Sequence, residues 1–243
     1  GPDPVEAVPA LSAQLQAFTQ ALPDGLLDED TSKELLALTG IDVAAGELAA
    51  DAQAAVCAAD RLGYPVVLKI VAESVTHKSD MGGVKLDLAD ADAVRAAYGQ
   101  IEAAARCVGA RFQGCLVQPM VQGDAELMIG TVYDEQFGPF VLVGTGGTLV
   151  ELTKDTCLLP APVSLRAAEQ ALRSLRYFPL LDGFRGREKA DLPKLARIVH
   201  QVSMLAAQLG PHLAELDINP LRVQGARAVA ADARARWVAR PRR

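Results

Sequence analysis

The pattern of apolar and polar residues alternates between stretches with helical spacing and short apolar runs that are typical of strands. The clearest helix is predicted over residues 191–209, where apolar side chains recur three and four positions apart, with Pro193 in the first turn and Gly210 at the end. Further helices are predicted at 10–22, 34–38, 51–62, 90–106 and 164–176. Strands are predicted at 65–72, 84–88, 115–121, 126–133, 139–143, 213–223 and 227–233. This order predicts a mixed α/β (α+β) fold in two lobes.

Proline and glycine positions suggest where the chain divides. Residues 1–27 hold four prolines among alanine and glutamine and are predicted to be a tail or linker with at most a short helix. Residues 28–120 are predicted to form the N-terminal lobe with its preceding helix, and residues 121–243 the C-terminal lobe. The hinge between the lobes is expected near residues 118–124.

Composition limits the kinds of partner. Thirty acidic against 24 basic residues give a net charge of −6, which argues against a broad nucleic-acid surface or an anionic membrane surface. Phosphate chemistry must therefore be local. No apolar run approaches the roughly 20 residues of a membrane span. The cysteines are scattered without a metal or disulfide pattern, and no secretory signal is visible, so we expect a cytoplasmic protein.

Near the C-terminus, the stretch ELDINPL places three polar side chains on one face of a predicted strand: Glu215, Asp217 and Asn219. Gln224-Gly225-Ala226-Arg227 fits a two-residue type II′ hairpin with glycine at its first central position. That register puts Asn219 opposite Asp232, about 5 Å away. Amide and carboxylate oxygens at this distance suit Mg²⁺. The alternative is a polar strand face exposed to solvent.

Three other features could bind or transfer phosphate, and each has an ordinary structural alternative. Lys69 interrupts an apolar strand, where it could grip a phosphate or extend to solvent from a sheet edge. Glycine loops at 82–83 and 144–147 could offer N–H groups to anions or serve as ordinary turns. His77, in the polar loop ESVTHKSDMGG, is either a solvated side chain or a phosphohistidine relay on a mobile mount.

Taken together, the motifs resemble a known family. LGYPVVLKIV with HKSDMGGV, QPMVQGDAELMIGTVYDEQFGP, VGTGGTLVE, ELDINPL and AVAADARA are similar to the ATP-grasp domain of the NDP-forming acyl-CoA synthetases. This is the β-type part, related to the β subunit of succinyl-CoA synthetase. The matching segments run from about Asp28 to Arg236.

The resemblance implies an ATP-grasp fold whose two lobes enclose the nucleotide, and it gives several residues a role toward ATP or ADP. Lys69 would contact the phosphates. Gln118 and Met120, in the hinge, would face adenine with their backbone groups. Glu126 would accept a ribose hydroxyl.

The same resemblance assigns the metal ligands and the relay. Asn219 and Asp232 match the Mg²⁺ ligands, with Asp217 close by, and His77 matches the histidine that relays the phosphoryl group. Gly146 and Gly147 belong to a signature (Gly144–Gly147 and Glu151) expected at the mouth where the phosphohistidine loop of the partner docks.

The function implied is one part of an ADP-forming acyl-CoA synthetase, which converts acid, ATP and CoA to acyl-CoA, ADP and phosphate. CoA and the first phosphohistidine would belong to partner ligase domains or a partner subunit, in a hetero- or homo-oligomer. An alternative is a sensor domain such as those fused to acetyltransferases, although the retained His77, Asn219 and Asp232 argue against it. The HKSD loop argues against a third reading, a carboxylate–amine ligase.

Overall fold

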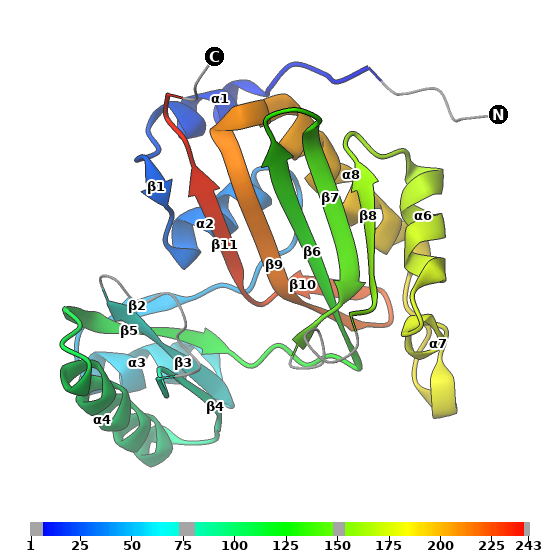
Figure 1. The fold of residues 1–243 in the computed structure, drawn as a ribbon. Coiled ribbons are helices and arrows are strands. Elements are labelled where there is room, and N and C mark those ends of the chain that lie inside the picture. Colours follow the sequence, from blue (N-terminus) through cyan, green and yellow to red (C-terminus); the bar gives the residue numbers. More distant parts are fainter. Residues whose placement is uncertain (1–6, 73–80, 148–153, 241–243) are drawn as a thin grey trace. The chain divides into compact units, whose positions relative to one another are not determined.

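The structure is a computed structural model that describes residues 7–72, 81–147 and 154–240. The chain divides into two compact units: Gly1–Val43 together with Gln122–Arg243, and Ala44–Val121 between them. Figure 1 shows the elements of both units. The second cut falls within the predicted hinge, but the first lies sixteen residues later than expected.

The smaller unit is a four-stranded antiparallel sheet with two helices on one face. Its strand order is β2 (Glu47–Ala49), β5 (Phe112–Pro119), β3 (Val66–Ala72) and β4 (Val84–Leu88). Helices α3 (Ala52–Leu62) and α4 (Ala91–Cys107) pack with the sheet in one core. Their N-termini are capped by Asp51 and Asp90, whose carboxylates accept backbone N–H groups three residues later.

The larger unit is built on a seven-stranded antiparallel sheet. Its strand order is β1 (Gly25–Leu26), β11 (Ala233–Trp237), β9 (Leu213–Gln224), β6 (Ala125–Asp134), β7 (Gly138–Thr145) and β8 (Thr156–Pro160), with β10 (Arg227–Ala230) paired to β9. Helices α2 (Glu29–Ala37), α6 (Leu165–Ser174) and α8 (Leu192–Leu209) form the main core with this sheet. In Figure 1, α2 and α8 lie behind the sheet. The remaining elements are α1 (Ala13–Gln20), α7 (Phe178–Leu181), η2 (Phe184–Gly186) and η3 (Gly210–His212).

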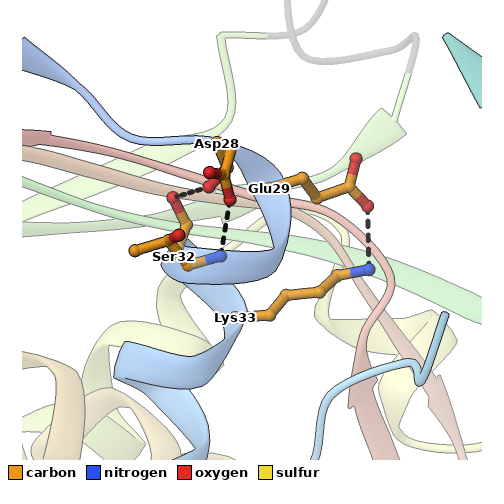
Figure 2. Close-up of polar contacts among 5 residues, drawn as sticks. Asp28, Glu29, Ser32 and Lys33 are labelled. Atoms are coloured by element: carbon orange, nitrogen blue, oxygen red, sulfur yellow. Dashed lines mark hydrogen bonds and ion pairs between the residues drawn. The ribbon is translucent and has the colours of Figure 1, made fainter. Parts of the chain in front are cut away.

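The start of α2 is held by a dense set of polar contacts, drawn in Figure 2. The Asp28 carboxylate caps the helix by accepting the Thr31 N–H at 2.7 Å. One turn along, Lys33 Nζ and Glu29 Oε1 form an ion pair of 2.8 Å whose side chains are each 4 % exposed. The Ser32 hydroxyl donates to the Asp28 carbonyl and accepts the N–H of Ala235 in β11. The Ser32–Ala235 hydrogen bond attaches α2 to the C-terminal strand.

The attachment of α2 explains a correction to the predicted boundaries. Residues 28–43 were expected to belong to the N-terminal lobe as its preceding helix, yet Leu35 and Leu36 are fully buried in the core of the larger unit. The expected tail at 1–27 is also wrong for its described part, because Leu15 of α1 is buried in that core and β1 pairs with β11. The short helix predicted within 10–22 is confirmed as α1.

Most of the other predicted elements are confirmed within a few residues. The prediction of one strand over 227–233 is wrong, because the segment forms β10 and then, after an interruption at 231–232, β11. Strands β1, β2 and β8 were not predicted. No helix among the described residues has the length and apolarity to cross a membrane.

Candidate functional site

The C-terminal hairpin has the register that the sequence predicted. Gln224 pairs with Arg227 across the turn, and Gly225 has a φ of 53° as the first central residue of a type II′ turn requires. The same register continues on both sides of the interruption, from Ala230 opposite Leu221 to Ala233 opposite Ile218. The Ala231 N–H donates to the Pro220 carbonyl at 3.0 Å. In this register, the position opposite Asn219 is that of Asp232.

The three polar residues of β9 lie on one strand face, as predicted. Glu215, Asp217 and Asn219 are exposed or half-buried and alternate with the buried Leu216 and Ile218. Partial burial raises the pKa of Asp217, Arg234 opposes this, and the charges of Asp232 and Glu215 raise the pKa further. Asp217 and Asp232 are therefore close enough to interact electrostatically.

The Asn219 side chain contacts the Gly146-Gly147 segment after the end of β7, called the glycine turn below. Its Oδ1 accepts the backbone N–H of Gly147 at 3.0 Å. The oxygen keeps a second lone pair for another partner. This contact joins residues 72 positions apart and brings the predicted metal ligand and the predicted glycine loop to one place.

These oxygen donors fit Mg²⁺. Among the described residues, no group of three or more His, Cys, Asp or Glu side chains is arranged to hold a metal ion. A site with one amide and one or two carboxylates would therefore need further ligands, and Mg²⁺ is commonly completed by water and substrate phosphates. Asn219 and Asp232, with Asp217 nearby, remain predicted ligands.

Glu126 lies against the same glycine turn. It is the second residue of β6 and pairs across the sheet with Arg222 of β9. Arg222 Nη1 lies 2.8 Å from Glu126 Oε1, and the Gly146 N–H donates to the Glu126 carbonyl at 2.8 Å. A Cβ at Gly147 would collide with the Glu126 carboxylate, and Gly147 has a φ of +71°. Glycine is therefore favoured at position 147, where any side chain would strain the backbone and displace the Glu126 carboxylate.

The smaller unit holds the other predicted nucleotide contacts. Lys69 lies on β3, between β4 and β5, and is only 6 % exposed. The alternative in which Lys69 extends to solvent from a sheet edge is therefore wrong. Its strand neighbours Leu68 and Ile70 belong to the core under the helices, so Lys69 projects from the opposite sheet face.

Gln118 and Met120 lie at and beyond the end of β5. Gln118 pairs with Val67, two residues before Lys69, so its side chain shares the sheet face of Lys69. Gln118 is 1 % exposed, and Gly46 packs against it: a Cβ at Gly46 would lie 3.0 Å from its Cγ. The Met120 N–H already donates to the Pro65 carbonyl at 2.9 Å. Of the Met120 backbone groups, its carbonyl therefore remains the predicted adenine contact.

His77 and Glu151 lie outside the described residues, so the relay and that part of the glycine signature stay predictions.

The sequence interpretation assigned no role to two residues of this region. Arg222 becomes apparent only when β6 and β9 are paired, since it lies 96 positions from Glu126. Asp155 accepts the Thr145 hydroxyl and the N–H groups of Arg176 and Tyr177, all at 2.9 Å. Burial raises the pKa of Asp155, but these hydrogen bonds outweigh it and hold the pKa below its ordinary value. Asp155 thereby ties the start of β8 to the end of β7.

Comparison with known proteins gives matches over most of the chain. A family described as ATP-grasp domain matches residues 19–236. The β subunit of acetate–CoA ligase [ADP-forming] I from Pyrococcus furiosus is 37% identical over 210 residues, which cover 86% of this chain and 90% of that subunit. Acetate–CoA ligase [ADP-forming] I from Archaeoglobus fulgidus is 40% identical over 185 residues, which cover 76% of this chain but 27% of that protein.

Solved structures agree with these matches. The dinucleotide-forming acetyl-coenzyme A synthetase 1 of Ca. Korarchaeum cryptofilum, in complex with coenzyme A and Ca-AMPCP, superposes with a TM-score of 0.85 at 35% identity, covering 94% of this chain and all of that chain. A second structure of that enzyme contains Mg-AMPPCP and has its phosphohistidine segment pointing towards the nucleotide binding site. It has a TM-score of 0.75 at 34% identity, covering 88% of this chain and 93% of that chain.

Proposed function

The chain belongs to the ATP-grasp domains of the ADP-forming acyl-CoA synthetases, and from this premise we propose that it is the nucleotide-binding, phosphoryl-transferring part of such an enzyme. The observation that carries the proposal is the hydrogen bond from the Gly147 N–H to Asn219 Oδ1. It brings the glycine turn, the Glu126 carboxylate and the Asn219–Asp232 pair into one part of the larger unit. Such a set of donors and acceptors suits a nucleotide with its metal ion.

Each residue has a task that follows from its chemistry. Phosphoryl transfer depends mainly on in-line positioning and on neutralising the phosphate oxygens. Lys69 would supply a positive charge to the phosphates from a buried position, where the attraction is stronger than in water. Glu126 would accept a ribose hydroxyl, and the backbone of Gln118 and the carbonyl of Met120 would contact adenine.

Asn219 and Asp232 would hold Mg²⁺, and Asp217 would support that site electrostatically. When bound, Mg²⁺ withdraws charge from the phosphate oxygens. An ionised Asp232 and the amide oxygen of Asn219 suit this ion because both are hard oxygen donors.

The relay step would be carried by His77. An imidazole nitrogen of His77 attacks the γ-phosphorus of ATP, a nitrogen–phosphorus bond forms, and the bond to the β–γ bridging oxygen breaks to release ADP. The neutral imidazole suits this step because it is a competent nucleophile near neutral pH. In the reverse direction, the phosphorylated histidine returns its phosphoryl group to ADP.

The remaining chemistry would belong to other domains. The chain spans about a quarter of the single-chain Archaeoglobus fulgidus relative but 90% of the Pyrococcus furiosus β subunit. We infer that CoA and the acyl phosphate are handled by ligase domains that carry the first phosphohistidine, either as a partner subunit or as part of a longer chain. Relatives are named for acetate, 4-hydroxybutyrate and trans-feruloyl-CoA, which supports a carboxylic acid as substrate of the complete enzyme.

Calorimetric titration with ATP, with and without Mg²⁺, tests nucleotide binding. We expect Mg²⁺ to strengthen ATP binding to the wild-type protein, and Asp232→Ala to remove that dependence. Asp92→Ala is the control, because the Asp92 side chain is 95 % exposed at the start of α4. Unchanged Mg²⁺ dependence in Asp232→Ala would remove the metal assignment.

A second experiment tests the relay. With the ligase domains, CoA and acetate supplied, His77→Ala should bind ATP nearly as the wild type does but should lose turnover. Normal turnover by His77→Ala would overturn the relay and would favour a binding or sensor role for the domain.

A further inference from the structure

We propose that Arg222 is a positioning residue for the nucleotide: it fixes the carboxylate of Glu126 and so connects the ribose end of the site to its metal end. This inference rests on the proposed function, because Glu126 and Asn219 are assigned there to the ribose and to Mg²⁺. In this proposal Arg222 does not contact the nucleotide itself. It acts through the groups it holds.

Arg222 and Glu126 are direct cross-strand partners. Their flanking residues on both strands, Ala125, Leu127, Leu221 and Val223, are buried in the core. Both charged side chains therefore project from the opposite face of the sheet. Arg222 Nη1 and Glu126 Oε1 are 2.8 Å apart, and the two side chains are 25 % and 27 % exposed. At this burial a ligand can reach the pair, while its attraction is less screened than on an open surface.

The Glu126 carboxylate is held from two sides. Arg222 contacts Oε1, and Gly147 packs against Oε2, with no space for a Cβ between them. The Glu126 backbone is fixed as well, because its carbonyl accepts the Gly146 N–H at 2.8 Å. Movement of the carboxylate would therefore disturb the glycine turn.

The glycine turn, held in place by Glu126, in turn contacts Asn219 at the metal end of the site. The Gly147 N–H donates to Asn219 Oδ1 at 3.0 Å. Asn219 and Arg222 both belong to β9, so the contacts close a ring that runs from β9 through β6 and the glycine turn back to β9. A register irregularity in the β6–β9 pairing lies within this ring, between Leu127 and Ile129. The side-chain contacts thus join the two ends of a stretch where the regular pairing is interrupted.

The aliphatic part of the Arg222 side chain packs against Gly123. A Cβ at Gly123 would lie 3.2 Å from Arg222 Cβ and 3.3 Å from its Cδ, so the stem passes close to the backbone of residue 123. Arg222 also balances the charge of Glu126. An unbalanced carboxylate would repel the phosphates of ATP, so loss of Arg222 should both release Glu126 and add repulsion.

The test uses Arg222→Met, which keeps much of the apolar stem, and Arg222→Lys, which keeps the charge. The ATP dissociation constant is measured by calorimetry at fixed Mg²⁺, and stability by urea unfolding. We expect Arg222→Met to weaken ATP binding about tenfold or more, with Arg222→Lys recovering most of the loss. Half-maximal ATP binding should also require more Mg²⁺ in Arg222→Met.

Arg236→Met is the matched control. Arg236 pairs with Glu215 across β11 and β9 on the same sheet, with 3.7 Å between Arg236 Nε and Glu215 Oε2. This variant should bind ATP within about twofold of wild type, because its partner lies away from the glycine turn.

A double-mutant cycle separates positioning from general stabilisation. In a Glu126→Gln background, Arg222→Met should add little further loss of ATP affinity, because the carboxylate that Arg222 holds is gone. Additive losses would overturn the proposal, as would wild-type ATP affinity in Arg222→Met. Failure of the wild-type protein to bind ATP would instead overturn the proposed function.

Discussion

Two ion pairs in the larger unit have the same contact distance and different surroundings. Lys33–Glu29 and Arg222–Glu126 each have 2.8 Å between nitrogen and oxygen. The first pair joins residues one helical turn apart, and its side chains are 4 % exposed. The second joins two strands beside the glycine turn, and its side chains are about one quarter exposed.

The difference in burial separates a role in the fold from a role in binding. The Lys33–Glu29 pair lies at the start of α2, beside the Asp28 cap and Ser32 (Figure 2). The Ser32 hydroxyl accepts the Ala235 N–H and so attaches this helix to β11. A ligand has little access to it, so removing one charge should act on stability. The Arg222–Glu126 pair can be reached by a ligand, so its removal should act first on nucleotide affinity.

The largest effect is expected for Lys33→Met. It removes one partner of a buried ion pair, which typically costs about 3–5 kcal/mol of unfolding free energy. Urea unfolding measures this loss, and ATP affinity at low temperature, where the variant is folded, should be unchanged. The double variant Glu29→Gln/Lys33→Met should regain part of the stability. A loss below about 1 kcal/mol for Lys33→Met would contradict the structural role of the pair.

The next effect is expected for Gly147→Ala, which places a methyl group against the Glu126 carboxylate that Arg222 holds. ATP affinity should fall by about tenfold to a hundredfold, because Glu126 and the glycine turn must move apart. Gly138→Ala is the matched control, since Gly138 has a φ of +82° and open space around it. Calorimetry compares the two. Equal ATP affinities in Gly147→Ala and Gly138→Ala would contradict a role for the contact between Gly147 and Glu126 in ATP binding.

Asp155 is a third carboxylate to compare with Glu29 and Glu126, because its hydrogen bonds come from a hydroxyl and two backbone N–H groups. Its lowered pKa means that its ionised form stabilises the fold above its unfolded-state pKa, and that this stability is lost as the pH falls through the folded-state pKa. Asp155→Asn should lower the unfolding free energy by about 1.5 kcal/mol at neutral pH. Urea unfolding across pH should show this difference shrinking below about pH 4. A difference that grows in acid would contradict the assignment.

The smallest effect is expected where an ion pair is largely exposed. Arg95 and Asp92 are 2.8 Å apart on α4, with side chains 47 % and 95 % exposed. Arg95→Gln should change the unfolding free energy by less than about 0.5 kcal/mol. A loss comparable to that of Lys33→Met would show that burial does not decide the effect of these pairs.

Local features of the fold were predictable from the sequence. Asp90 and Ser164 cap helices α4 and α6 as predicted, because a cap oxygen and the backbone N–H that donates to it lie three residues apart. The hairpin at Gly225 was predictable for the same reason, since the turn type sets the strand register. That register carried the prediction as far as the level of Asn219 and Asp232.

Features that depend on distant pairing were not predictable. The Arg222–Glu126 contact needs β6 and β9 side by side, and no local pattern brings them together. The assignment of residues 28–43 to the larger unit depends on α2 packing against β11, some 200 residues further along the chain. For Lys69, composition could not distinguish an edge strand from the interior strand that the sheet order reveals.

The central claim is that Mg-ATP binds beside Glu126, Gly147 and Asn219, away from the buried pair on α2. Amide spectra of the isotope-labelled wild-type protein, recorded during titration with ATP and Mg²⁺, test this most directly. The backbone amide resonances of Gly146 and Gly147 and the side-chain amide resonance of Asn219 should shift. The backbone amide resonance of Lys33 should stay in place. Shifts confined to α2, with the glycine turn unchanged, would contradict the account.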